Sequence, residues 1–199
     1  MKKVTGKRVV AYIIDYFIVA LIASLFARVQ ILNPQYDEYM KEYQNYTESL
    51  KEIMTDESGT EKLESMSYDL AKKSININII SLVVSVIYFV GFQFINKGQT
   101  LGKKILKLKL IDTENEKLKF YQVLLNSAVI NNLVTTGLTI LFITYMSKAT
   151  YLKYSQVLQL LEIGLLLGSL AFMIMRNDGR GLHDLLAKTN VVKEEEKWK

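Results

Sequence analysis

The chain has 199 residues, 50% hydrophobic and 23% charged, with a formal net charge of +5. It has no cysteine and one histidine, which excludes disulfides, thiolate metal sites and thiol catalysis and argues against a histidine metal cluster. The averages resemble those of a globular domain. However, the apolar residues gather in blocks that are almost free of charge, which indicates a polytopic membrane protein.

Four apolar blocks are long enough, at ~1.5 Å per helical residue, to cross roughly 30 Å of hydrocarbon. They are expected to be membrane spans at about 9–29, 75–96, 123–146 and 157–175. The basic N-terminus does not lead into a short apolar region with a cleavage site. The first block is therefore expected to be retained as a span.

The third block is the least regular of the four, because Asn126, Asn131 and Asn132 interrupt it. An uncharged stretch of this length favours a true span. The alternative is an interfacial helix followed by a short re-entrant piece.

Basic residues are unevenly distributed among the connecting segments. Segments 1–8, 97–119 and 176–199 carry 17 of the 25 Lys and Arg residues, whereas segment 28–75 carries ten acidic ones. Cytoplasmic loops hold the excess of Lys and Arg. Four spans therefore place both termini in the cytoplasm. The Lys-, Ile- and Asn-rich composition suggests a bacterial genome, so the expected location is the bacterial cell (plasma) membrane.

Residues 33–74 are expected to form an external helical hairpin. Asn33 and Pro34 suit an N-cap and a first helical position, and apolar residues then recur every three or four positions. A turn at 55–60 leads into a second polar helix that continues to the second span. The hairpin either binds a ligand or partner, or is a solvated connection between two spans.

A second, shorter hairpin is expected on the cytoplasmic side. Residues 104–110 alternate between apolar and basic side chains, and residues 117–120 alternate again after a turn-like segment. Such a hairpin can rest on anionic lipid headgroups, where each Lys gains roughly 1 kcal/mol. The expected fold is thus an all-α four-transmembrane-helix bundle with an external helical hairpin and a short amphipathic cytoplasmic hairpin.

Three short motifs occur in order along the chain. They read Arg8-Val-Val-Ala-Tyr-Ile-Ile-Asp15, Gly98-Gln-Thr-Leu-Gly-Lys103 and Arg180-Gly-Leu-His-Asp184. Together they resemble the RDD family of bacterial membrane proteins, named for one Arg and two Asp. The resemblance covers the chain except segment 33–74, which looks like an insertion. It implies a membrane protein that transports unidentified ligands or exchanges cations for protons.

The chain departs from the family pattern at one place. The family commonly has an Arg entering the third helix, where this chain reads Leu124-Leu125-Asn126. If that Arg binds something in the family, this chain lacks it.

Asp15 is the leading candidate for a functional group. An ionised Asp deep in a span costs about 2.5–3.5 kcal/mol, so it is expected to face the bundle interior with a partner. It is either a cation or proton site, or part of a structural contact with Arg8, Arg180 or a helix end. Glu162 lies at a different depth. It is either a second station of a pathway or a residue near the outer surface that pairs with Arg28 or Lys153 or is neutral.

The other polar candidates are Asn131, Asn132, Arg180 and Asp184. They either bind a ligand or ion together with the residues above or only stabilise the fold. Asn131 and Asn132 lie between the two acids in the pathway interpretation. Asp184 beside Arg180 is expected to accept hydrogen bonds from a helix end or an Arg, which fixes the C-terminal segment under the bundle. His183 has no second ligand or nucleophile in the sequence to work with.

Small residues at Gly164 and Gly168 permit close helix packing, within the chain or between protomers. No nucleophile–base pair, metal-ligand set or cofactor loop is recognisable, so an enzyme, a cofactor and a metal are not expected, nor is a nucleic-acid partner. The expected functions are transport and, as the alternative, an accessory or regulatory subunit of another membrane protein. Transport by so few spans suggests a homo-oligomer.

Overall fold

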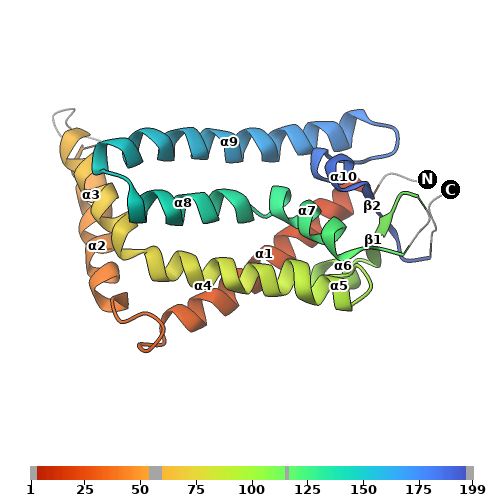
Figure 1. The fold of residues 1–199 in the computed structure, drawn as a ribbon, viewed down its shortest axis with the longest axis horizontal. Helices are drawn as coiled ribbons and strands as arrows, with labels where there is room; N and C mark the ends of the chain where they lie inside the picture. Colours follow the sequence, from red (N-terminus) through yellow and green to blue (C-terminus); the bar gives the residue numbers. More distant parts are fainter. Residues whose placement is uncertain (1–3, 54–59, 115–116, 196–199) are drawn as a thin grey trace.

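The computed structural model describes residues 4–53, 60–114 and 117–195, most of them in long helices that run side by side (Figure 1). Three helical segments are long and apolar enough to cross a membrane. They are α1 (Thr5–Ala27), the continuous segment Ile75–Ile95 and α9 (Lys148–Met175). The second segment consists of α4 (Ile75–Val86), a π-helical turn η2 (Ile87–Phe92) and α5 (Gln93–Ile95).

The third apolar block is not one straight helix. It forms α7 (Phe120–Ile130) and α8 (Leu133–Tyr145), which are bent by 65° relative to each other. Asn132 stands at the break with a φ of 54°, a left-handed conformation that Asn tolerates better than most residues. This residue stops the helical ladder of α7. The described chain therefore has three candidate spans, or four if the bent pair counts as one.

A helical hairpin occupies one end of the bundle (Figure 1). It consists of α2 (Tyr36–Ile53) and α3 (Thr60–Lys73), which pack together and share an ion pair of 3.3 Å between Lys73 and Glu42. Most of the turn predicted at 55–60 lies outside the described residues. We call this part of the molecule the hairpin end.

Asn33 does not cap the helix that follows it, so that part of the prediction is wrong. Its side chain is fully buried, and Nδ2 donates to the carbonyl of Ala27, 3.1 Å away. Asn33 therefore closes the end of α1, and α2 begins only at Tyr36. A buried helix terminus leaves carbonyls without partners, and Asn33 satisfies one of them.

The opposite end of the bundle contains a small antiparallel sheet, so the chain is not all-α. Strand β1 (Leu108–Asp112) pairs with β2 (Thr189–Lys193), with Leu110 opposite Val191. The predicted local hairpin between 104–110 and 117–120 is wrong. The first part of this segment forms α6 (Leu101–Ile105), and the strand takes its partner from the far end of the sequence. We call this part the sheet end; it also contains α10 (Leu182–Ala187).

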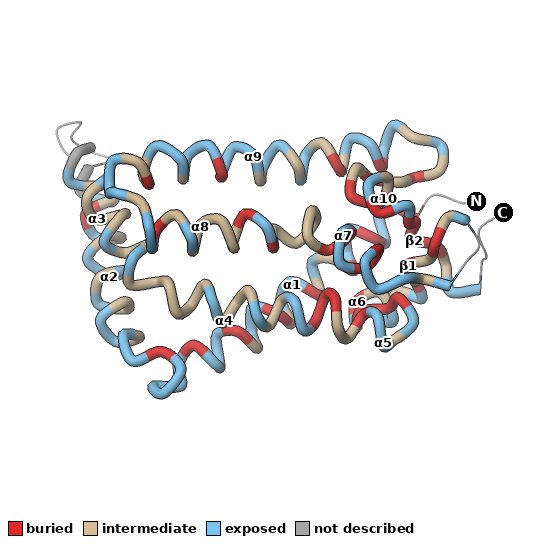
Figure 2. Tube along the Cα trace, in the orientation of Figure 1, coloured by how far each residue is buried: buried red, intermediate tan, exposed pale blue. Residues whose placement is uncertain are grey.

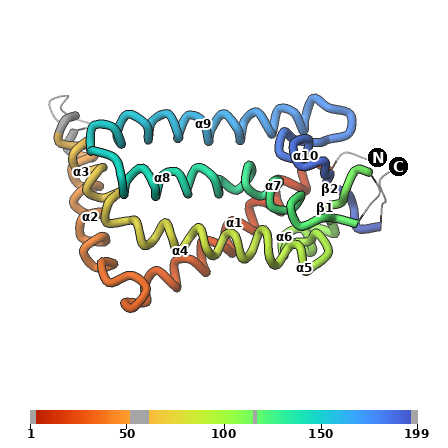
Figure 3. The backbone as a smooth tube through the Cα atoms, viewed as in Figure 1, coloured from red at the N-terminus to blue at the C-terminus, as the bar shows by residue number. Residues whose placement is uncertain are grey.

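Burial is concentrated at the sheet end (Figure 2). A cluster of buried apolar side chains joins α1, η2, α7 and the two strands, and includes Ala11, Val90, Leu110, Val123 and Val191. Figure 3 shows the same meeting of distant segments, with red α1 and blue β2 at one end. By contrast, long apolar side chains along the spans are exposed, as expected for surfaces that face lipid.

Candidate functional site

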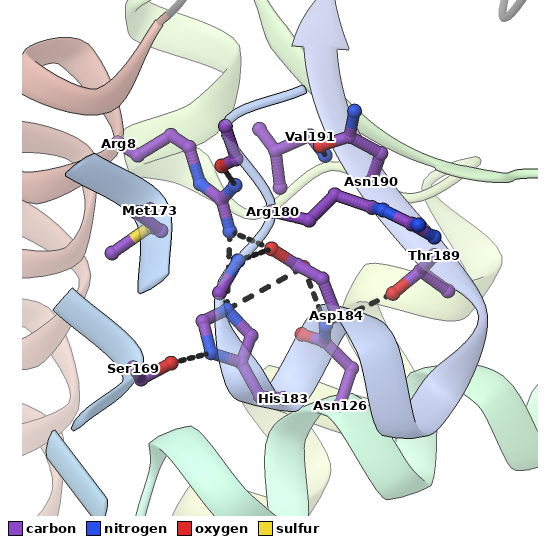
Figure 4. A network of polar contacts seen from close by, with 12 residues as sticks. Arg8, Asn126, Ser169, Met173, Arg180, His183, Asp184, Thr189, Asn190 and Val191 are labelled. Atoms are coloured by element: carbon purple, nitrogen blue, oxygen red, sulfur yellow. Dashed lines mark hydrogen bonds and ion pairs between the residues drawn. The ribbon is translucent and has the colours of Figure 1, made fainter. Parts of the chain in front are cut away.

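Arg8 and Asp184 form a buried ion pair at the sheet end (Figure 4). Arg8 lies in the first turn of α1, and its Nη2 donates to Asp184 Oδ2 across 2.5 Å. The other terminal nitrogen, Nη1, donates to the carbonyl of Gly179 across 2.8 Å. The planar guanidinium thus holds the C-terminal segment against α1 through two hydrogen bonds.

The remaining acceptor positions of Asp184 are also used. The backbone N–H of Gly181 donates to Oδ2 (2.8 Å), and Asn126 Nδ2 on α7 donates to Oδ1 (3.0 Å). Burial alone raises the pKa of Asp184, but the charge and hydrogen bond of Arg8 and the N–H of Gly181 outweigh it, so the pKa lies below its ordinary value. Asp184 is therefore held as a carboxylate. Hydrogen bonds from an Arg and from the start of a helix are the contacts expected of Asp184 if its role is to hold the C-terminal segment in place.

His183 extends this network to α9 (Figure 4). Arg8 Nη2 lies 3.1 Å from His183 Nε2, and His183 Nδ1 contacts Ser169 Oγ. A guanidinium only donates, so Nε2 accepts and Nδ1 carries the proton that is donated to Ser169. Burial lowers the pKa of His183 to about 4, against the smaller opposite effect of Asp184. The imidazole is therefore neutral at pH 7 and joins α1 to α9.

Asp15 belongs to a second buried network, seven residues further along α1. Its Oδ1 accepts hydrogen bonds from Tyr88 Oη (2.6 Å) and from the backbone N–H of Gly102 (2.7 Å). Its Oδ2 accepts one from Thr100 Oγ1 (2.5 Å). Tyr88 Oη in turn accepts from the N–H of Leu101, 3.1 Å away. Asp15 therefore anchors the start of α6 to the first span.

Gly102 makes this anchoring possible. A Cβ at this position would lie 2.9 Å from the Asp15 carboxyl carbon and would collide with the carbonyl oxygen of Ala11. Only glycine lets α6 approach α1 so closely. The motif at residues 98–103 is thus a helix start that holds a carboxylate of its own chain, in place of a bound anion.

The π-helical turn η2 places Tyr88 toward Asp15. Three consecutive residues, Tyr88, Phe89 and Val90, are all buried, which one face of a regular α-helix does not provide. π-turns inside helices occur frequently at functional sites.

A cavity of about 270 Å³ lies beside both networks, just below the ~300–1,000 Å³ typical of small-ligand sites. Its walls are mostly apolar side chains of α1, η2, α7 and α9, such as Leu170 and Met173. Val9 and Leu167, which also line it, are 37% and 58% exposed. The cavity therefore opens sideways between α1 and α9, onto the apolar surface of the bundle.

Polar groups gather on one side of this cavity. Lys103 Nζ donates to Gln93 Oε1 across 3.2 Å, and Gln93 is 1% exposed. Gln93 Nε2 has no hydrogen-bond partner among the described residues. Burial lowers the pKa of Lys103 to about 8, and the nearby Asp15 carboxylate limits that shift. Arg8 and Asp15 line the same space.

The other predicted residues are dispersed. Asn131 lines the cavity and Asn132 forms the joint between α7 and α8. Arg180 pairs with Asp178 across 3.0 Å.

Glu162 is half-buried on α9, and it forms an ion pair with neither Arg28 nor Lys153. In the part of the chain that the structure describes, no three His, Cys, Asp or Glu side chains gather as a metal site.

Several contributing residues were not identified from the sequence. Three of them, Gln93, Asn126 and Ser169, are polar residues inside apolar blocks. Because polar residues are rare within membrane spans, this position could have identified them as candidates. Tyr88 carries no such signal, because aromatic residues are ordinary members of an apolar block, and Thr100 lies in the motif at 98–103 without being singled out there.

Comparison with known proteins gives one match. The model of the RDD family matches residues 4–188. No curated protein and no solved structure matches the chain.

Proposed function

This chain belongs to the RDD family, and from that premise we propose that it binds a small ligand in the cavity and moves it across the membrane. The observation that carries the proposal is the cavity itself. Apolar walls with a few convergent polar groups are the usual composition of a small-molecule site. The proposed route begins at the sheet end, where Arg8, Lys103 and Asn131 line the space.

Cation or proton exchange through intramembrane acids has less support. Asp15 already accepts three hydrogen bonds, and every one of its neighbours in that network is a donor. Glu162 is not among the residues that line the cavity. A cation needs unoccupied oxygen lone pairs, so ligand transport ranks first and exchange second.

We place the sheet end in the cytoplasm of a bacterial cell. Lys97 and Lys107 are exposed there and suit contact with anionic lipid headgroups. This orientation puts both termini inside. Because the chain has no cysteine, single substitutions report topology cleanly. A membrane-impermeant maleimide applied to intact cells should label Thr47→Cys on α2 and leave Lys104→Cys unlabelled; the opposite pattern overturns this orientation.

The transport proposal predicts that the cavity can be reached by a water-soluble reagent from both sides of the membrane. In proteoliposomes of known orientation, Asn131→Cys should react with an impermeant maleimide from the sheet-end side and, after a conformational change, from the other side. Leu21→Cys is the matched control, since its side chain is 63% exposed on the apolar surface of α1 and should react from neither. Labelling of Asn131→Cys from one side only overturns transport.

A flux measurement separates the exchange hypothesis from ligand transport. Proteoliposomes that contain a pH-sensitive dye are challenged with Na⁺ or K⁺ gradients. Ligand transport predicts no proton movement in response to either cation. Proton flux that disappears in Asp15→Asn, with the variant still folded, makes exchange the better proposal.

An accessory subunit, as part of a homo-oligomer or bound to another membrane protein, is the second candidate function. Gly164 and Gly168 on α9 have open space beside them, since a Cβ at either would meet no atom within 4 Å. Such glycines allow close approach of a helix from another chain. If this is their role, Gly164→Leu should reduce the mass of the particle measured by light scattering, whereas Gly137→Leu on α8 should not.

A further inference from the structure

The polar side of the cavity has more hydrogen-bond donors than acceptors. Lys103 Nζ carries three N–H groups and uses one on Gln93 Oε1. The oxygens of Asp15 already accept from Tyr88, Thr100 and Gly102. Arg8 also lines the cavity, but its charge is already paired with Asp184, so Lys103 is the group that favours an anion here. An acceptor group with negative charge would therefore complete this part of the cavity.

Gln93 strengthens this point because its amide orientation is fixed. Lys103 has no acceptor, so the amide oxygen of Gln93 must face it and the nitrogen must point elsewhere. That nitrogen is buried and has no partner within residues 4–53, 60–114 and 117–195. Buried donors in folded proteins nearly always have a partner, so an unmet one beside a cavity points to a ligand.

The apolar side of the cavity differs in chemistry and direction. Ile130, Leu166, Leu167 and Leu170 line it, and Leu166 and Leu167 are exposed to the surroundings of the bundle. α1 packs against α4 and α6, whereas α9 packs against α8 and α10, which leaves the opening between α1 and α9. A ligand that enters here comes from the hydrocarbon of the adjacent leaflet rather than from water.

We propose that the cavity binds an amphiphile with one anionic headgroup, a carboxylate or a phosphate monoester, attached to a single apolar chain. The headgroup accepts hydrogen bonds from Lys103 Nζ and Gln93 Nε2, and the chain leaves sideways between α1 and α9. This inference rests on the assignment of the cavity as the ligand site of the proposed function. It adds the chemical class and the route of entry.

Burial makes the charge of Lys103 responsive to such a ligand. The pKa of about 8 leaves the amine mostly protonated at pH 7 but close to its titration range. An anion beside it favours the charged form. The amine and the headgroup therefore stabilise each other in a space with little water.

The test is native mass spectrometry of the purified full-length protein released from neutral detergent. The probes are oleate, oleoyl lysophosphatidic acid and oleoyl lysophosphatidylcholine, which share one acyl chain and differ in headgroup charge. We expect one copy of an anionic probe per chain, retained more tightly than lysophosphatidylcholine. Inorganic phosphate at millimolar concentration distinguishes a free anion from a lipid headgroup, and we expect it not to displace the bound lipid.

Two lysines on α6 provide a matched pair of variants. Lys103→Gln removes the charge at the cavity, and the loss of a charge-assisted hydrogen bond should weaken anionic binding about tenfold or more. Lys104→Gln removes an exposed charge one residue away and should leave binding unchanged. Should Lys103→Gln fail to fold, Gln93→Glu places a carboxylate beside Lys103, retains that contact, and should weaken anionic binding similarly.

Three results overturn the proposal. These are equal retention of lysophosphatidylcholine, equal effects of Lys103→Gln and Lys104→Gln, and displacement of the lipid by inorganic phosphate. Binding and transport are scored separately. Lipid binding without two-sided labelling of Asn131→Cys supports this inference and overturns transport. Two-sided labelling without lipid binding supports transport and overturns this inference.

Discussion

Arg8 Nη2 and Asp184 Oδ2 lie 2.5 Å apart, although 176 positions separate the two residues in the chain. Seven residues after Arg8, Asp15 holds α6 through Gly102 and Thr100. Both side chains project from the buried face of α1. The first helix is therefore the common support for the two segments that enclose the cavity at the sheet end.

Removing the charge of Arg8 should strongly destabilise the protein. Arg8→Gln leaves the buried carboxylate of Asp184 without its cation, which costs about 3–5 kcal/mol when one partner of a buried pair is lost. Lys7→Gln changes an exposed charge on the neighbouring residue and should have little effect. The measurement is thermal unfolding of the detergent-solubilised protein. Adding Asp184→Asn to Arg8→Gln should restore part of the loss; no restoration contradicts the pairing.

Substitution of Gly102 should separate α6 from the first span. Gly102→Ala forces a Cβ against Asp15 and Ala11, and overpacking of this kind costs about 1–3 kcal/mol. Gly137→Ala is the control, because a Cβ at that position of α8 meets nothing within 4 Å. Unfolding temperatures of the two variants give the comparison. The predicted close approach is refuted if Gly102→Ala is as stable as Gly137→Ala.

Acid should destabilise the protein through His183, the sole histidine of the chain. Its pKa is about 4 in the folded protein and 6.5 ordinarily, so between these values the unfolded chain binds a proton that the folded chain does not. The contribution of His183 to the free energy of unfolding is thus fully present above pH 6.5 and is lost as the pH falls toward 4. His183→Asn removes this titration.

The difference in unfolding temperature between wild type and His183→Asn should therefore narrow from pH 7 to pH 4.5. Asp184 affects stability only at lower pH. Because its pKa is lowered in the folded protein, its contribution to stability is lost only when the carboxylate becomes protonated, below the range of this comparison. A difference that stays constant with pH shows that His183 is not held neutral in the fold.

Cysteine pairs can test which segment pairs with β1. Lys109 lies opposite Val192 in the sheet, so Lys109→Cys with Val192→Cys should form a disulfide under mild oxidation. Lys109→Cys with Phe120→Cys represents the hairpin expected from the sequence, in which these two residues face each other across a turn at 113–116, and should form little. The extent of cross-linking is read from gel mobility before and after reduction. Preferential cross-linking of the second pair contradicts the sheet.

The long apolar segments were predictable because hydrophobic length is a property of the local sequence. The break at Asn132 was indicated only in part: Asn131 and Asn132 interrupt the third block, but the sequence does not show that Asn132 takes the left-handed conformation that bends it. The strand at Leu108–Asp112 was visible from its alternation, yet its partner β2 was not. Alternation specifies which side chains face the core, but it does not specify which distant strand completes the pair.

The candidate site was predictable to a similar degree. Arg8 and Asp15 stand out because charges in or beside apolar blocks are costly, and Asp184 stands out as part of the third motif. Their partners depend on how the helices pack, which the local sequence does not determine. Lys103 ends the motif at residues 98–103, but its contact with Gln93 beside the cavity is known only from the structure.

The distance along the chain between Arg8 and Asp184 also determines when the ion pair can form during synthesis. The ribosome delivers α1 well before α10 and β2, so the guanidinium has no carboxylate while the residues between Arg8 and Asp184 are translated. During that time it is best accommodated among water and lipid phosphates at the membrane surface. The sheet end can therefore close only after β2 has been translated, so this region assembles later than α1 inserts into the membrane.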